Sequence, residues 1–145
     1  MLYQTATTSF KVQLAQGLHN FGPTSPNTFY IALFTAASTI NATTPTYNTA
    51  LVGEVVGTGY SQGGQQLTIT TTPTSGISGT TAYWSFANVL WSPAAFTARG
   101  AMIYNASKSN ASVCILDFGA DKTCTNSFTI QFPTAVASSA ILRIA

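Results

Sequence analysis

The chain is built from short runs of β-branched and aromatic residues. These runs are separated by turn residues at fairly regular intervals. From residue 28 onward, no run is long enough to hold a helix and the crossover connection that a parallel sheet requires. This pattern is typical of an antiparallel sandwich or barrel. We predict about eight strands, at Thr28–Thr35, Gly53–Tyr60, Gln66–Thr72, Thr81–Leu90, Ala101–Asn105, Val113–Phe118, Ser127–Phe132 and Ala140–Ile144.

Alternation of side chains indicates which of these strands cover a core. It is clearest in Tyr83–Leu90 and in Phe128–Phe132. Successive side chains of a strand point to opposite faces of the sheet, so each of these strands should bury one face. The predicted fold class is therefore mainly β, a single antiparallel β-sandwich.

One short helix is predicted near the N-terminus. Thr7–Leu18 carries apolar side chains close to the three-to-four spacing of an amphipathic helix. Gly17 weakens the last turn. Gly22-Pro23 and Ser25-Pro26 end the helix, because the residue before a proline is pushed out of helical geometry. The polar stretches further on resemble surface loops and not interdomain linkers. We therefore predict one domain over residues 1–145, with residues 1–27 as an N-terminal arm and helix.

The composition points to a surface with little charge. Hydrophobic residues make up 46% of the chain and charged residues only 6%, whereas about 25% of a typical soluble domain is charged. Thr, Ser, Asn and Gln take the place of charge on the surface. A formal net charge of +2 gives little repulsion between copies. Such a surface suits a subunit that self-assembles.

Charge and hydropathy also exclude two classes of partner. The five cationic side chains are scattered along the chain, whereas phosphate binding needs clustered Lys and Arg, so we predict no nucleic-acid partner. The longest apolar run, Phe29–Phe34, is far too short for a membrane span. The N-terminal residues lack the basic and apolar regions of a signal peptide.

The groups available for catalysis are few. Acid–base chemistry would have to use His19, Glu54, Asp117 or Asp121. A hydrolase would need His19 to meet a serine and a carboxylate, and a solvated or capping histidine is the favoured interpretation. We predict no catalytic residue, no metal site and no cofactor.

Two further motifs have structural interpretations. Asp117 and Asp121 flank Phe118-Gly119, which suits a turn whose carboxylates accept from backbone N–H groups, with a weak calcium site as the alternative. Gly57-x-Gly59 and Gly63-Gly64 lack a following lysine and helix, so a strand edge and hairpin is favoured over phosphate binding.

The cysteines and the large aromatic residues also leave alternatives open. Cys114 and Cys124 are predicted to be free thiols, with a hairpin disulfide as the alternative. An aromatic group in the predicted strands is predicted to fill the core, with a sugar-binding platform as the alternative. Its members are Trp84, Phe86, Trp91 and Phe96.

The order of the landmarks along nearly the whole chain resembles a family of small virion proteins of tailed bacteriophages. The landmarks are the helix ending near His19-Asn20, Thr28-Phe-Tyr-Ile-Ala-Leu-Phe-Thr35, Gly53-Glu-Val-Val-Gly-Thr-Gly-Tyr-Ser-Gln-Gly-Gly64, Trp84-Ser-Phe-Ala-Asn-Val-Leu-Trp91, Phe96-Thr-Ala-Arg-Gly-Ala-Met-Ile-Tyr-Asn105 and Leu116-Asp-Phe-Gly119.

This resemblance implies a jelly-roll-like β-sandwich in the virion, assembled in the bacterial host cytoplasm. It implies a non-enzymatic decoration or cement protein that bridges neighbouring capsid subunits, with the major capsid protein and copies of itself, as a dimer or trimer, as partners. Placement among the tail proteins is the alternative. As interface candidates we single out Leu2, Tyr3 and Phe10, in an N-terminal segment that could reach a neighbour.

A second class of function stays open beside assembly. The chain could be a tail-fibre or receptor-recognition module whose aromatic residues and Asn/Thr loops hold a glycan. Saturable glycan binding by the isolated domain would favour this interpretation.

Overall fold

The computed structural model describes residues 1–76 and 79–145. Strands make up 41% of it and helix 8%. The helical elements are α1 (Thr8–Ala15) and the 3₁₀ turn η1 (Ala106–Lys108). The strands are β1 (Thr5–Ala6), β2 (Phe29–Phe34), β3 (Gln65–Gln66), β4 (Ile69–Ser75), β5 (Ala82–Phe86), β6 (Val89–Trp91), β7 (Phe96–Asn105), β8 (Ala111–Cys124), β9 (Phe128–Ile130) and β10 (Leu142–Ile144).

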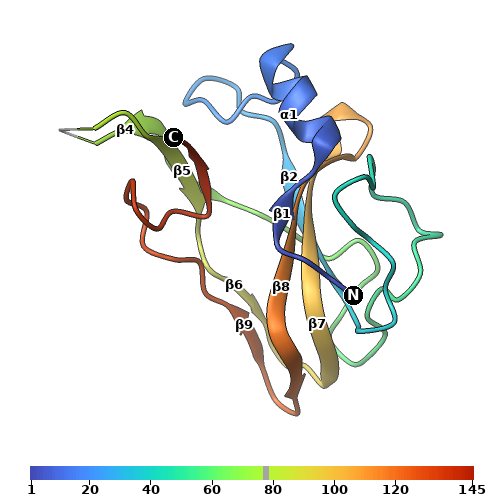
Figure 1. Cartoon of the computed structure of the whole chain (residues 1–145). Helices are drawn as coiled ribbons and strands as arrows, with labels where there is room; N and C mark the ends of the chain where they lie inside the picture. The colour runs from blue at the N-terminus through green and yellow to red at the C-terminus, as the bar shows by residue number, and fades with distance from the viewer. Residues whose placement is uncertain (77–78) are drawn as a thin grey trace.

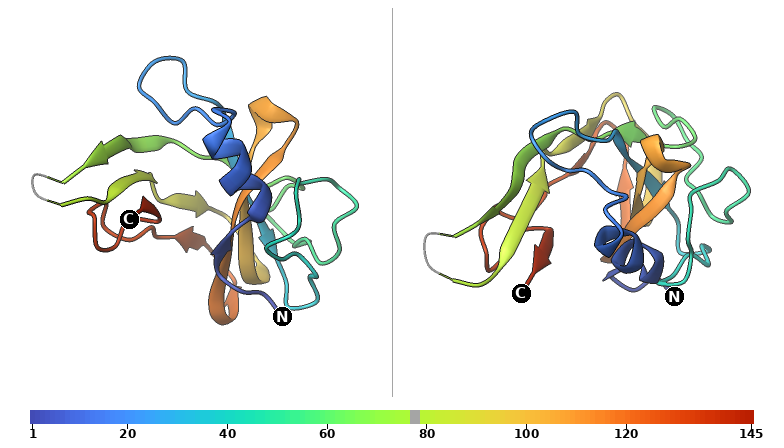
Figure 2. Two further views of the ribbon diagram at one scale, coloured as in Figure 1. Left: turned by 45° about the horizontal axis from the view of Figure 1, so that its top comes forward. Right: turned by 90° about the horizontal axis from the view of Figure 1, so that it is seen from above.

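The strands form three antiparallel sheets (Figure 1). The largest has the order β1-β8-β7-β2-β3, a second has the order β10-β5-β4, and the third pairs β6 with β9. The two smaller sheets follow one another along one side of the large sheet, and the β4–β5 hairpin extends away from it in both views of Figure 2. The mainly β class and the antiparallel β-sandwich are confirmed. The jelly-roll connectivity stays a prediction.

Apolar side chains cover both faces of the five-stranded sheet. On one face, Ile31 and Ile103 pack with Trp84, Phe86 and residues of β6 and β9, so this core lies between the sheets. On the other face, a second cluster packs beneath the long segment that joins β2 to β3 and beneath the N-terminal arm. Its buried members are Leu2, Ala32, Phe34, Ile40, Tyr47, Met102, Tyr104 and Ile115. Central strands buried on both faces explain why β2 reads as one continuous apolar run.

The predicted helix is present and shorter than its apolar pattern. The side chain of Thr7 caps its N-terminus by accepting from the Phe10 N–H. Gly17 has a φ of 71°, the left-handed conformation that commonly follows a helix end. The helix therefore ends at Ala15, three residues before Leu18. No helix in the described ranges has the length and apolarity of a membrane span.

Most predicted strands are present, with bounds that backbone pairing decides. The run Gln66–Thr72 divides into β3 and β4, and Thr81–Leu90 divides into β5 and β6. β7 begins at Phe96, well before Ala101, and β8 continues to Cys124 because its exposed polar end pairs with the beginning of β7. Pairing of this kind needs only backbone groups and leaves no hydrophobic pattern.

The prediction of a strand over Gly53–Tyr60 is wrong. This segment makes only isolated bridges, at Glu54 and Thr58. Gly53 and Gly59 have φ values of 83° and 80°, which a regular strand does not allow. A Cβ on Gly59 would meet the carbonyl oxygen of Pro93. The segment is therefore a folded loop that lies close to neighbouring backbone.

Candidate functional site

The three interface candidates occupy two different environments. Leu2 and Phe10 are buried in their own chain, with 3% and 4% of their surfaces exposed, and Tyr3 is 64% exposed. Leu2 belongs to the core beneath the N-terminal arm, and Phe10 to the core between the sheets. Of the three, only Tyr3 exposes most of its side chain. Their contact with a partner stays a prediction.

His19 is not the solvated or capping residue that the sequence favoured. It is 7% exposed and lies between Phe10 and Phe21, with ring centroids at 5.0 and 6.3 Å. Its Nδ1 accepts from the Asn105 amide at 3.0 Å, and its Nε2 donates to Gln13 at 3.0 Å. Burial, and then the Lys108 charge, lower the pKa of His19 from 6.5 to about 4. A neutral histidine therefore anchors the segment after α1 to β7.

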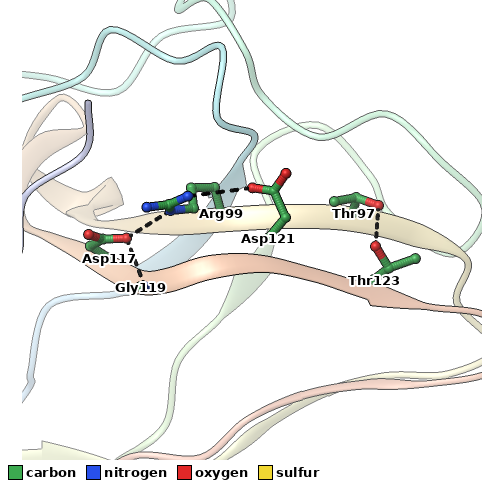
Figure 3. Close-up of polar contacts among 6 residues, drawn as sticks. All are labelled: Thr97, Arg99, Asp117, Gly119, Asp121 and Thr123. Carbon is green, nitrogen blue, oxygen red and sulfur yellow. Dashed lines mark hydrogen bonds and ion pairs between the residues drawn. The ribbon is translucent and has the colours of Figure 1, made fainter.

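Residues 117–121, predicted as a turn, are instead part of strand β8 and form a bulge against β7 (Figure 3). The Asp117 carboxylate accepts from the Gly119 N–H at 2.9 Å and from Arg99 Nε at 3.2 Å. These bonds lower the pKa of Asp117. Asp121 lies 3.9 Å from the same guanidinium group. Figure 3 also shows Thr97 and Thr123 joined at 2.7 Å through their hydroxyl groups.

The alternatives for the cysteines and the aromatic group are decided. Cys114 and Cys124 are free. They pair with Ile103 and Phe96, which lie seven positions apart on β7, so about 23 Å separates them at the usual rise of a strand. Trp84, Phe86 and Trp91 are at most 3% exposed. Phe96 is 7% exposed. These side chains fill the core and do not form an exposed sugar-binding platform.

A polar cluster that no sequence motif indicated surrounds Glu54. Tyr47 donates its hydroxyl to Oε2 at 2.8 Å, and Tyr60 donates to Oε1 at 2.9 Å. The Gly63 N–H also donates to Oε1, at 2.6 Å. Tyr104 completes the cluster by donating to the Gly63 carbonyl at 2.8 Å. We call these five residues the Glu54 cluster.

The Glu54 cluster fastens the long loop before β3 onto the five-stranded sheet. Tyr47 and Tyr104 stack at 4.5 Å, and the Tyr60 hydroxyl accepts from the Leu33 N–H of β2 at 2.9 Å. Burial, followed by the Glu54 hydrogen bond and charge, raises the pKa of Tyr47. Burial and then the charge of Glu54 raise the pKa of Tyr104 to about 12. The tyrosines are therefore neutral at ordinary pH. Tyr47 and Tyr60 donate to the Glu54 carboxylate, and Tyr104 donates to the Gly63 carbonyl.

A hollow of about 370 Å³ opens beside the Glu54 cluster. Its lining includes Leu51, Glu54, Val56, Tyr60 and Gln62. Val56 is 94% exposed at its rim. An exposed valine beside a partly buried carboxylate is a combination of apolar and anionic surface.

A second hollow, of about 410 Å³, lies between the end of β8 and strand β9. Phe118, Phe128 and Ile130 supply its apolar lining, and Lys122 and Gln131 supply polar groups. Phe118 and Phe128 lie 6.2 Å apart between ring centroids. We call this hollow the β8–β9 groove.

The three-stranded sheet has a neutral edge. Residues 55–98, which include β4 and β5, contain no Asp, Glu, Lys, Arg or His. Strand β4 pairs with β5 on one side, and no strand of the described ranges pairs with its other side. Its edge carries mostly threonine together with Pro73, which is tolerated there because an edge strand does not need every N–H.

Neither a metal site nor a known relative identifies the chain. Within residues 1–76 and 79–145, no group of three or more His, Cys, Asp and Glu side chains could hold a metal ion. Comparisons with protein-family models, with curated proteins and with solved structures find no significant match.

Proposed function

We propose that the chain is a non-enzymatic structural protein of a tailed-phage virion, a decoration or cement protein that bridges neighbouring capsid subunits. The observation that carries the proposal is the neutral edge of strand β4, on a hairpin that extends away from the main sheet. An unpaired edge offers a row of backbone donors and acceptors to another chain. Soluble proteins commonly guard such edges with charge, and this one has none.

The separation of the β4 edge from the five-stranded sheet supports the same proposal. The five-stranded sheet carries the cores on both faces, so a contact at β4 would not disturb it. A cement protein stabilises a shell by binding only where neighbours are assembled, and many equivalent weak contacts act together. A low-charge surface lets copies approach closely without repulsion.

The experiment is to locate the chain in particles of the phage that encodes it. Purified particles are separated into heads and tails, and the chain is quantified in each fraction by mass spectrometry. We expect it in the head fraction, at a copy number comparable to that of the major capsid protein. Recovery in the tail fraction would replace the cement role by a tail role, and absence from the particles would reject a virion protein.

The β8–β9 groove favours one alternative, a glycan-binding tail module. Its pair of phenylalanines and its Lys122 and Gln131 side chains combine apolar and hydrogen-bonding surface, as sugar sites do. In this case a glycan array would show saturable binding that Phe118→Ala abolishes. The tail fraction would then hold the chain, and the head fraction would not.

A further inference from the structure

Glu54 differs from the other carboxylates of the described residues in having no cationic partner. Asp117 and Asp121 both lie within 4.0 Å of Arg99. The three groups that donate to Glu54 are two tyrosine hydroxyls and one backbone N–H, all neutral. The described part of the chain therefore holds one negative charge that is fixed in place and not paired with a cation.

The carboxylate also has room for a further donor. An ionised carboxylate offers about four acceptor positions. Oε1 receives Tyr60 and Gly63, whereas Oε2 receives only Tyr47. One position on Oε2 therefore receives no donor from the described residues, on a group that its neighbours already hold in a single orientation. A preorganised acceptor of this kind binds a cation with little further ordering.

The adjoining hollow matches the shape and chemistry of a basic side chain. Lysine and arginine carry a long aliphatic stem and a charged end. Leu51 and the exposed Val56 provide apolar surface in the hollow, and Glu54 provides the anion. We propose that this hollow binds an arginine or lysine side chain of a neighbouring subunit, with Glu54 as the ion-pair partner.

The identity of the neighbour as a capsid or virion subunit rests on the proposed function. The chemistry of the hollow does not depend on the proposed function, because the Glu54 carboxylate without a cationic partner among the described residues is a feature of the isolated chain. A specific ion pair at this position would set the register of two subunits, which the uncharged edge of β4 does not do by charge.

The test is a titration of the purified chain with N-acetyl-arginine amide. The chemical shifts of the Gly63 and Val56 backbone amides in ¹⁵N-correlated NMR spectra report the binding. The neutral isostere N-acetyl-citrulline amide is the control ligand. We expect saturable shifts with the arginine ligand at millimolar concentration and about tenfold weaker binding of the citrulline ligand. Equal shifts with both ligands, or no saturable shift with either, would overturn the proposal.

Matched variants connect the binding to Glu54. Glu54→Gln should reduce arginine binding about tenfold, whereas Asp121→Asn, which removes the same charge elsewhere, should leave it unchanged. Val56→Ser changes a side chain that is 94% exposed and cannot unfold the chain by opening a cavity. It should weaken binding severalfold, and Val136→Ser should not. Unchanged binding in both Glu54→Gln and Val56→Ser would overturn the site.

Failure of this proposal is distinguishable from failure of the proposed function. A chain that binds arginine in the hollow and is absent from particles loses only the virion role. A chain found in heads that does not discriminate arginine from citrulline loses only the Glu54 ion pair.

Discussion

The five-stranded sheet and the three-stranded sheet differ in how fully the chain covers them. Both faces of the central strands of the first are buried, so that β2 and β7 have no side chain that is mostly exposed, whereas the end of β8 is exposed. Strand β4 of the second has no fully buried residue, and no other strand of the described residues pairs with its outer edge. The comparison separates a part of the molecule that sets its stability from a part that is available for contact.

The largest expected effect compares two isoleucines in the two sheets. Ile31 is fully buried in β2, and Ile144 of β10 is 50% exposed. Ile31→Ala should reduce the free energy of unfolding by about 2–5 kcal/mol, because it removes apolar contacts and leaves a cavity. Ile144→Ala should change it by no more than about 0.5 kcal/mol. Urea unfolding, monitored by circular dichroism, measures both free energies of unfolding. Equal decreases in the two variants would contradict the difference in burial between the two sheets.

The second prediction concerns how the free energy of unfolding depends on pH through His19. The pKa of His19 is about 4 in the folded chain, below the ordinary value of 6.5 that it has in the unfolded chain. As pH falls through this interval, the unfolded state binds a proton that the folded state does not, so folding stability decreases. We expect a loss of up to about 3 kcal/mol.

Urea unfolding at pH 7 and at pH 4.5 checks this prediction. His19→Gln should flatten the dependence in that interval, whereas the exposed Lys11→Gln should keep it. A wild-type chain equally stable at both pH values would contradict the buried neutral state of His19.

A third prediction concerns the loop that covers the outer face of the large sheet. Tyr47→Phe removes one donor from the Glu54 carboxylate. The loss of a hydrogen bond to a charged group should cost about 1.5–3 kcal/mol. Tyr3→Phe, at an exposed position, should cost nothing measurable. Thermal unfolding of the two variants compares them, and equal midpoints would mean that the Glu54 cluster does not hold the loop.

The smallest effect on stability is expected at the free edge. Thr74→Lys places a charge on exposed β4 and should change the free energy of unfolding by no more than about 0.5 kcal/mol. Light scattering at high protein concentration should show less self-association than in the wild type, because edge-to-edge pairing would bring like charges together. The control Thr39→Lys adds the same charge on a loop and should leave the solution mass unchanged. A wild-type monomer at every concentration would mean that β4 needs another partner.

The site was less predictable than the fold. Glu54 and Gly63 appeared in the sequence as a scarce acid and a turn glycine, and Tyr104 belongs to a strand more than forty residues away. No spacing rule connects them, because the contacts form only when the loop folds back onto β2 and β7. Leu2 and Phe10 were equally ambiguous, since an apolar residue near a chain end can cover its own core or a neighbour's.

The sequence by itself determined the mainly β class, the N-terminal helix and the positions of most strands. These features follow from local chemistry, since side-chain alternation, β-branched residues and turn residues act over a few positions. Only the tertiary structure decided that Gly53–Tyr60 is a loop, that β8 continues to Cys124, that His19 is buried and neutral, and that Glu54 has no cationic partner among the described residues. Each of these depends on which distant segment supplies the hydrogen-bond partner, and that information is not contained in any short stretch of the chain.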